Sequence, residues 1–458
     1  MRRRPSRRNA YAAAARYYGE ALELWPPDSD GRPSLLLSLG RARFVLGHDS
    51  AERTLEEARE ALLASEQRAQ AGVAEAILAE IWWFRGNRDR CDLYLERAHA
   101  HVADLPPSND KAHVLAQASR FHAIAGDNAG AIRIGGEALA IAELLQLAEV
   151  QAQALISIGW AKGGVDAIED LERALAIALA ARSPQAVRAA HNLGAAVSYL
   201  GDIRRGEPLF DEAIRIAEEF GYRLMARFSR GEKIELLFWL GRWAEAMTLA
   251  EDAIAERATG DGHPQEHRLR RRRAFVRLAR GDTDGALDDV RVMLELAREV
   301  KDPQSLHPAL AGGARIYANA GRIEEARALA AELVATFRDA ADWFLVEAAW
   351  VAEELGYAEE LRRLFEEVPN RTAWGRAGLA LLDGNYEAAA EAFAETGDME
   401  SEAAARLRAG EKLLAEGRRA EADEQLVKAL AFFRSVDATR YIREAEALLS
   451  APVESRSQ

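Results

Sequence analysis

The chain has 458 residues, 49% of them hydrophobic, and its 60 lysines and arginines against 74 aspartates and glutamates give a net charge of −14. The longest uninterrupted apolar run, residues 174–181, is eight residues long, whereas crossing a bilayer takes about 20. A single cysteine, Cys91, supports neither an internal disulfide nor a cysteine metal cluster. Composition therefore excludes a membrane span, a disulfide scaffold and a zinc finger, and favours the cytoplasm.

A glycine recurs along the chain at the end of apolar-periodic stretches, at a mean interval of 37 residues. These glycines are Gly47, Gly86, Gly126, Gly163, Gly201, Gly241, Gly281, Gly321, Gly356, Gly384 and Gly417. The interval is typical of helix–turn–helix repeats, and glycine accepts the positive φ at which helices end. The residues that follow several of them, Asn87, Asp127, Asp202, Asp282 and Asn385, are suited to cap the next helix.

Apolar residues on both sides of each glycine keep a period near 3.6, and sustained alternation of the strand type is missing. The fold class is therefore expected to be all-α. Small residues recur five and twelve positions after the glycine, for example Ala246 and Ala253 after Gly241. Seven residues span about two helical turns, so both alanines face the same way and allow the two helices of a pair to approach closely.

The segments Leu240–Ala246 and Asp383–Ala389 resemble the turn region of tetratricopeptide (TPR) repeats. The resemblance covers residues 10–450 and implies a right-handed α-solenoid of about eleven repeats, between a basic tail at residues 1–9 and a disordered tail at residues 451–458. The period is longer than the family's 34, and the segments after Gly163 and Gly356 lack the small residues. Overall, the chain resembles the C-terminal TPR region of large bacterial nucleotide-cyclase and signal-transduction ATPase regulators. The sequence leaves open whether it is free-standing or the tail of a longer ancestor.

The first helix has the spacing of the second member of a pair, so the array is expected to begin in mid-repeat. An unpaired first helix leaves an apolar face uncovered. We therefore expect Ala14, Tyr18 and Leu22 to form an exposed stripe that supports self-association or docks a partner.

Motifs of catalysis are weak. Gly-Lys and Gly-x-Ser-x-Gly are absent, which argues against a phosphate-binding loop and a hydrolase elbow, and Cys91 is interpreted as a core residue. His263 to His267 spell an inverted zinc-protease motif. Because residues 259–262 are turn-forming and Pro264 suits a first helical turn, we expect both histidines at an exposed helix start. No enzyme, metal or cofactor is predicted.

The TPR resemblance places the first helix of each pair on the inner, concave wall. Counting back from five of the turn glycines predicts a wall of Arg120, Arg188, His191, Tyr199, Phe228, Glu235, Trp239, Arg268, Arg271 and Arg315. Arginines bind carboxylates in pairs, so this wall favours an acidic or carboxylate-terminated peptide. Arg272 and Arg273 are expected to point away from the groove.

The leading hypothesis is a non-enzymatic protein-interaction scaffold in bacterial signalling or transcriptional regulation. The alternative is a ligand-sensing module that binds a small molecule in the groove. The net negative charge and the lack of a DNA-reading motif argue against a nucleic-acid partner.

Overall fold

The computed structural model describes residues 8–26, 29–256, 263–337, 342–368 and 372–451. All regular structure in these residues is helical. They form two compact units. Unit 1 comprises residues 1–196, 208–230 and 299–302, and unit 2 comprises residues 197–207, 231–298 and 303–458, apart from the undescribed positions. None of the described helices is long and apolar enough to cross a membrane.

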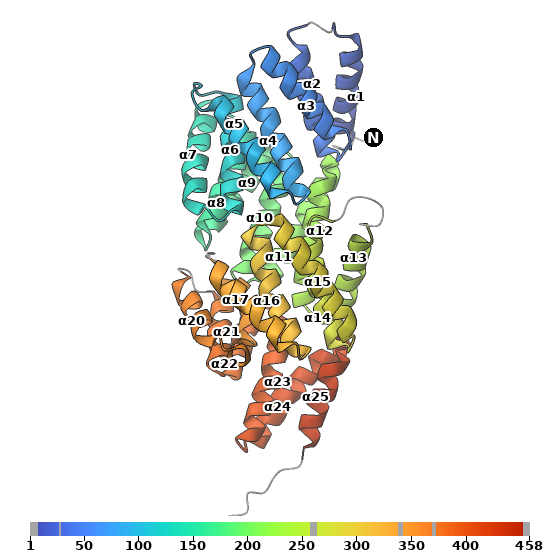
Figure 1. Ribbon diagram of the computed structural model, residues 1–458, viewed down its shortest axis with the longest axis vertical. Helices are drawn as coiled ribbons and strands as arrows, with labels where there is room; N and C mark the ends of the chain where they lie inside the picture. The colour runs from blue at the N-terminus through green and yellow to red at the C-terminus, as the bar shows by residue number, and fades with distance from the viewer. Residues whose placement is uncertain (1–7, 27–28, 257–262, 338–341, 369–371, 452–458) are drawn as a thin grey trace, which may run out of the picture. The chain divides into compact units, whose positions relative to one another are not determined.

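The helices follow one another along the chain as labelled in Figure 1. The first nine lie within unit 1: α1 Arg8–Leu24, α2 Arg32–Val45, α3 Ala51–Ala64, α4 Arg68–Phe84, α5 Arg88–Val102, α6 Asn109–Ile124, α7 Asn128–Leu144, α8 Ala148–Lys162 and α9 Asp166–Ala180. The residues of four helices are divided between the units: α10 Gln185–Tyr199, α11 Ile203–Phe220, α12 Arg223–Trp239 and α15 Thr283–Val300.

The remaining helices lie within unit 2. They are α13 Trp243–Ala255, α14 Glu266–Ala279, α16 Pro303–Asn319, α17 Ile323–Thr336, the 3-10 helix η2 Asp342–Leu345, α18 Val346–Ala349, α19 Ala352–Leu355, α20 Ala358–Glu367, α21 Ala373–Leu382, α22 Tyr386–Thr396, α23 Met399–Ala415, α24 Arg419–Ser435 and α25 Thr439–Ser450.

Every glycine predicted to turn the chain does so. All eleven have positive φ, between 62° for Gly163 and 101° for Gly201, and each lies between two helices. The five predicted caps are also confirmed, because each side chain accepts a hydrogen bond from a backbone N–H three residues later. The N···O distances are 3.0 Å for Asn87, 2.9 Å for Asp127, 3.1 Å for Asp202, 2.9 Å for Asp282 and 3.2 Å for Asn385.

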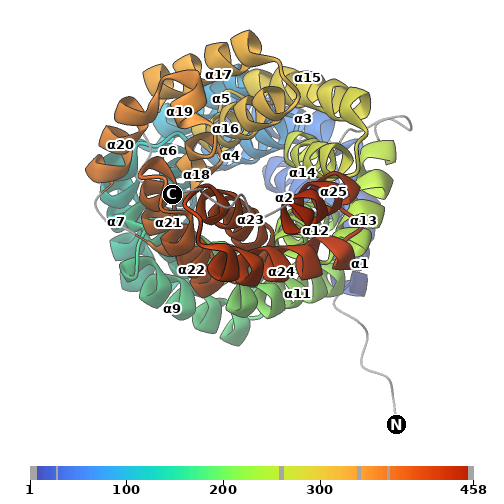
Figure 2. The ribbon, with the colours of Figure 1, turned by 90° about the horizontal axis from the view of Figure 1, so that it is seen from below.

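The small residues pack the pairs as predicted. Ala246 is 2% exposed and Ala253 is partly buried against the same core as Leu269. In unit 2 the first helices α14, α16, α18, α21 and α23 lie inside and their partners α15, α17, α20, α22 and α24 lie outside (Figure 2). The pair that turns at Gly356 differs, since its first helix is broken into η2, α18 and α19. The predicted fold class, an all-α solenoid of TPR-like repeats, is confirmed.

The turns between consecutive pairs were not predicted. Five of them hold a residue other than glycine at positive φ, which costs an L-residue about 1–2 kcal/mol. These are Glu66 at 57°, Gln146 at 58°, Arg182 at 53°, Lys301 at 59° and Asp437 at 56°. Two other turns between pairs hold a glycine at positive φ, Gly221 at 73° and Gly397 at 85°. The same backbone requirement is therefore met by glycine inside pairs, and between pairs either by glycine or by another residue at a cost.

The N-terminal helix corrects one prediction. α1 packs against α2, and Leu22 is buried while Ala14 and Tyr18 are half-buried. The predicted exposed stripe is therefore wrong. The exposed apolar side chains at this end are Tyr17, Leu24 and Trp25. α1 begins at Arg8, so residues 8 and 9 are helical; residues 1–7 of the predicted basic tail and 452–458 of the predicted C-terminal tail lie outside the described residues.

Candidate functional site

The ten residues predicted to line a groove divide between the two units. Arg120, Arg188, His191 and Phe228 belong to unit 1, and Tyr199, Glu235, Trp239, Arg268, Arg271 and Arg315 belong to unit 2. Most of them are buried rather than open to solvent: Arg271 is 2% exposed and Arg315 is 4% exposed. Each unit holds its own polar network around these arginines. Their role in binding a ligand stays a prediction.

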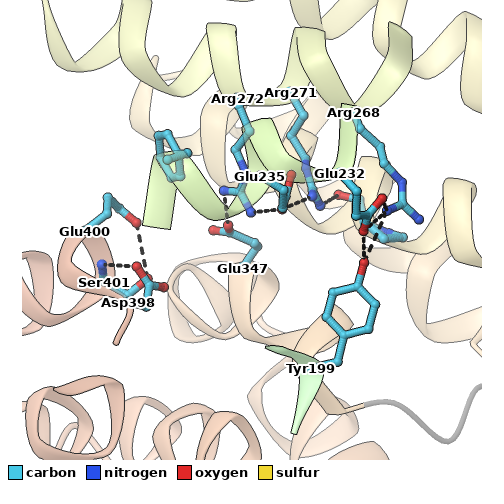
Figure 3. A network of polar contacts seen from close by, with 12 residues as sticks. Tyr199, Glu232, Glu235, Arg268, Arg271, Arg272, Glu347, Asp398, Glu400 and Ser401 are labelled. Atoms are coloured by element: carbon cyan, nitrogen blue, oxygen red, sulfur yellow. Dashed lines mark hydrogen bonds and ion pairs between the residues drawn. The ribbon is translucent and has the colours of Figure 1, made fainter. Parts of the chain in front are cut away.

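In unit 2 the arginines are paired with carboxylates of the same chain (Figure 3). Arg268 donates to Glu232 at 2.8 Å, and Arg271 donates to Glu235 at 2.6 Å. Arg272 also donates to Glu235. The acidic residue that a groove would take from a ligand is thus supplied here by α12.

Two further carboxylates come from later helices of unit 2. Glu347 on α18 accepts from Arg272 at 3.1 Å and from Arg315 at 2.6 Å, so it joins α14 to α16. Glu400 on α23 accepts from Arg315 at 3.0 Å. The contact of Glu347 with Arg272 joins residues 75 positions apart along the chain, and that of Glu400 with Arg315 joins residues 85 positions apart.

The charges of this network balance. Four arginines, Arg268, Arg271, Arg272 and Arg315, face four glutamates, Glu232, Glu235, Glu347 and Glu400. Burial raises the pKa of Glu235, but the neighbouring Arg271 and Arg272 outweigh it and lower that pKa to about 2. A further carboxyl, Asp398, is buried beside Glu400, and burial first and Glu400 second raise its pKa to about 8. It is thus mostly protonated at neutral pH, and the network is neutral.

Aromatic rings enclose the same network. Tyr199 stacks on Trp343 with ring centroids 4.4 Å apart, and Trp239 contacts Trp374 at 5.2 Å. The guanidinium of Arg272 lies 4.5 Å from the ring centroid of Phe238. Such rings exclude water and strengthen each ion pair, so this part of unit 2 has the character of a structural core.

The network of unit 1 is centred on Glu80 of α4. Arg120 on α6 donates to it at 2.5 Å and Gln117 at 2.9 Å. The Tyr222 hydroxyl donates to it at 3.3 Å, and Gln153 on α8 extends the network by donating to Gln117 at 2.8 Å. The first helices of three successive pairs, α4, α6 and α8, together with Tyr222 just before α12, therefore contribute to one line of polar contacts.

Arg188 on α10 is the unbalanced member of this network. It is 5% exposed, and within the described residues its guanidinium makes one hydrogen bond, to Gln185 Oε1 at 3.2 Å on its own helix. Burial, and after it the positive charge of Arg120, lower the pKa of Arg188 to about 9. Glu80, whose negative charge acts on Arg188 through space, already forms an ion pair with Arg120. Within the described residues, Arg188 therefore has no hydrogen bond to a carboxylate.

The two remaining predicted residues of unit 1 are ring contacts. His191 lies 5.1 Å from Phe228 and 5.3 Å from Phe210 between centroids, and its Nδ1 lies 3.1 Å from Ser229 Oγ. Phe228 also contacts Trp83 at 5.6 Å. Phe228 and Trp83 pack against the core of unit 1.

Two expectations about neighbouring residues are corrected. Arg272, expected to point away, is 3% exposed and belongs to the network of unit 2, because Glu235 and Glu347 both reach it. Arg273 does turn elsewhere, toward Asp289 on α15 at 2.6 Å. His263 and His267 are 6% and 4% exposed, so the expected exposed helix start is wrong. No group of potential metal ligands is found in the described part of the chain.

Sequence reasoning missed most of the carboxylates. Glu80, Glu232, Glu347 and Glu400 were not singled out, because acidic residues are common in helices and only the fold shows which face inward. A usable signal existed for Glu232: it precedes Arg268 by 36 residues, about one repeat, as Glu235 precedes Arg271.

No known family profile and no curated protein matches the chain. Among solved structures, a Rap protein complexed with competence and sporulation factor resembles it with a TM-score of 0.51 and 16% identity, over 71% of this chain and 97% of that one. The Cut9–Hcn1 hetero-tetramer of APC/C gives a TM-score of 0.46 at 12% identity, covering 97% and 92%. The human IFIT1 dimer with m7Gppp-AAAA gives 0.41 at 11%, covering 97% and 95%.

The likeness to the Rap protein, together with the helix pairs and their turn glycines, defines the class: the chain is a TPR-like helical-repeat protein.

Proposed function

We propose that the chain is a non-enzymatic interaction scaffold that binds an acidic, extended segment of another protein along the polar line of unit 1. The observation that supports this is the charge imbalance there, because Glu80 is paired with Arg120 while the hydrogen bond of Arg188 goes to the neutral Gln185. A buried charge without its own partner is costly, and a ligand carboxylate would complete the network. We infer a role in bacterial signalling or transcriptional regulation in the cytoplasm from the sequence resemblance alone.

The networks of the two units differ in what they offer a ligand. In unit 2 each of the four network arginines already has a carboxylate from the chain. A ligand that displaced one of these carboxylates would leave it buried without a partner, which is strongly destabilising. In unit 1 Arg188 has no hydrogen bond to a carboxylate of the described chain, so a ligand carboxylate would not have to replace one there. We therefore place the proposed binding function in unit 1 and interpret the unit 2 arginines as structural. The Rap protein of similar fold, which was crystallised in complex with a factor, is compatible with such a role.

The test is a binding assay with matched peptides. Fluorescence anisotropy of labelled six-residue peptides rich in glutamate is compared with peptides in which glutamine replaces every glutamate. We expect binding of the acidic series only, weakening as salt increases. Equal affinity for both series, or for a lysine-rich series, would contradict the proposal.

The alternative, a module that senses a small molecule, is favoured by one observation. Arg188 retains only 5% of its surface, so a small anion reaches it more easily than a long segment does. Thermal-shift screening of small carboxylates and phosphates separates the two functions. Micromolar affinity for a metabolite, with no affinity for acidic peptides, would favour the sensing function.

A further inference from the structure

Arg188 and Arg268 occupy the same place in their repeats. Each lies 13 residues before its turn glycine, Gly201 and Gly281 respectively. The partner of Arg268 is Glu232, which lies 36 residues earlier on the preceding first helix. The residue 36 before Arg188 is Ala152, on the preceding first helix α8, and it is fully buried.

The chain therefore repeats the arginine but omits its carboxylate. In α8, the stretch from Val150 to Ile156 holds two glutamines and no acidic residue. Glu149, just before it, is already paired with Arg41. The carboxylate of Glu80 is taken by Arg120, and the hydrogen bond of Arg188 goes to the neutral amide of Gln185.

We propose that Arg188 is the receptor for one carboxylate of the ligand, which takes the place beside Arg188 that Glu232 takes beside Arg268. This inference rests on the proposed function and names the chemistry of its anchor. The guanidinium presents a planar fork of N–H donors that matches a carboxylate. The carboxylate is either the C-terminus of a peptide or an aspartate or glutamate side chain, and the experiment distinguishes these sources.

Two variants remove the imbalance in opposite ways. Arg188→Gln deletes the extra positive charge. Gln153→Glu keeps Arg188 and adds a negative charge on α8, one residue from Ala152, with almost no change of volume; it also removes the amide that donates to Gln117 at 2.8 Å. The matched control is Gln151→Glu, the same substitution two residues away, where the side chain is half-buried and donates to the carbonyl oxygen of Ala142 at 3.0 Å.

The probes are acetate, with acetamide as its neutral counterpart, and the acidic six-residue peptide with a free or an amidated C-terminus. We expect acetate to raise the melting temperature of the wild type and of Gln151→Glu but not of the other two variants. Peptide affinity should fall at least about tenfold in Arg188→Gln and in Gln153→Glu, as expected for one charge-assisted contact. Amidation should weaken binding to the wild type, and leave Arg188→Gln unaffected, if the anchor is the C-terminus. If the anchor is a side chain, replacing one peptide glutamate by glutamine should weaken binding to the wild type and leave Arg188→Gln unaffected.

Stability of the free protein separates a receptor from a structural arginine. Removing an unpaired buried charge should leave the melting temperature of Arg188→Gln equal or higher, whereas removing a paired one should lower it. A lower melting temperature together with unchanged peptide affinity would overturn the inference and leave the scaffold function standing. Acetate stabilisation that depends on Arg188, with no peptide binding at all, would support the receptor and overturn the scaffold function.

Discussion

Asp398 gives the sharpest test of the unit 2 network. Its side chain caps α23 by accepting a hydrogen bond from the Ser401 N–H at 3.1 Å, and it is 1% exposed. Burial and the neighbouring Glu400 raise its pKa from 3.8 to about 8. The folded protein therefore keeps a proton that the unfolded chain releases near pH 4.

The sign of the effect follows from this difference. Between about pH 4 and pH 8 the unfolded state loses the proton of Asp398 and the folded state does not, so stability falls as pH rises. Each pKa unit is worth 1.36 kcal/mol, which sets a ceiling of about 4 kcal/mol between pH 5 and pH 8. Coupling to Glu400 and local relaxation reduce this contribution, so we expect the stability of the wild type to fall by about 2–4 kcal/mol through Asp398 between pH 5 and pH 8.

Asp398→Asn removes the titrating group and keeps the cap, because asparagine caps helices as well as aspartate does. We expect the variant to gain about 2–4 kcal/mol over the wild type on going from pH 5 to pH 8. Urea unfolding measures the gain, and hydrogen exchange of the α23 amides localises it.

The matched control is Asp127→Asn. Asp127 caps α7 in the same way but is exposed, and the hydrogen bond from the Gly130 N–H, with the contact to His122 second, lowers its pKa. This substitution should give no gain with rising pH. If Asp398→Asn and Asp127→Asn respond alike to pH, then Asp398 is ionised in the folded state and the neutrality of the network is refuted.

Three other predictions concern the turns and the ion pairs. Gly321→Ala should destabilise the protein by about 1 kcal/mol through its positive φ alone, because a Cβ on Gly321 would meet nothing within 4 Å. Gly241→Ala should cost about 1–2 kcal/mol more, because a Cβ on Gly241 would lie 2.9 Å from Phe432 Cε2. Equal losses of the two variants in urea unfolding would contradict this prediction. Arg182→Gly should stabilise by about 0.5 kcal/mol, because relief of the strained φ exceeds the entropy cost, and a lower melting temperature would refute it. Glu235→Gln should cost about 3–5 kcal/mol, because it leaves the buried Arg271 without a carboxylate and Arg272 with Glu347 alone. A loss below 1 kcal/mol would show that the pairs do not hold unit 2 together.

Local features of the fold could be predicted and distant ones could not. The turn at Gly241 and the cap by Asp127 depend on the residue itself and on backbone atoms a few positions away, which the sequence shows directly. The positive φ of Arg182 could not be predicted, because an arginine occupies the turn position and only a glycine would have indicated it in the sequence. Broken helices such as α18 were hidden too, since periodicity does not show where a helix is interrupted.

The candidate site was predicted as a set of residue types but not as a set of contacts. The arginines were correctly placed on first helices, but Glu347 lies 75 residues beyond Arg272 and Glu400 lies 85 residues beyond Arg315. Those distances correspond to about two repeats, and no local pattern says that an acidic side chain two repeats later faces back. The predicted wall therefore contained three arginines of unit 2 and Glu235, but not Glu232, Glu347 or Glu400.

The balance of charges around each buried arginine distinguishes a structural arginine from a candidate for binding. An arginine on a first helix is structural where the chain supplies its carboxylate, as Glu232 does for Arg268, and is a candidate for binding where the chain omits it. Ala152 marks such an omission for Arg188. A buried unpaired charge lowers stability, so Arg188 would be unfavourable if it served packing alone. A ligand carboxylate would offset that cost. The Gln153→Glu variant measures the loss of ligand affinity when the chain itself supplies a negative charge on α8.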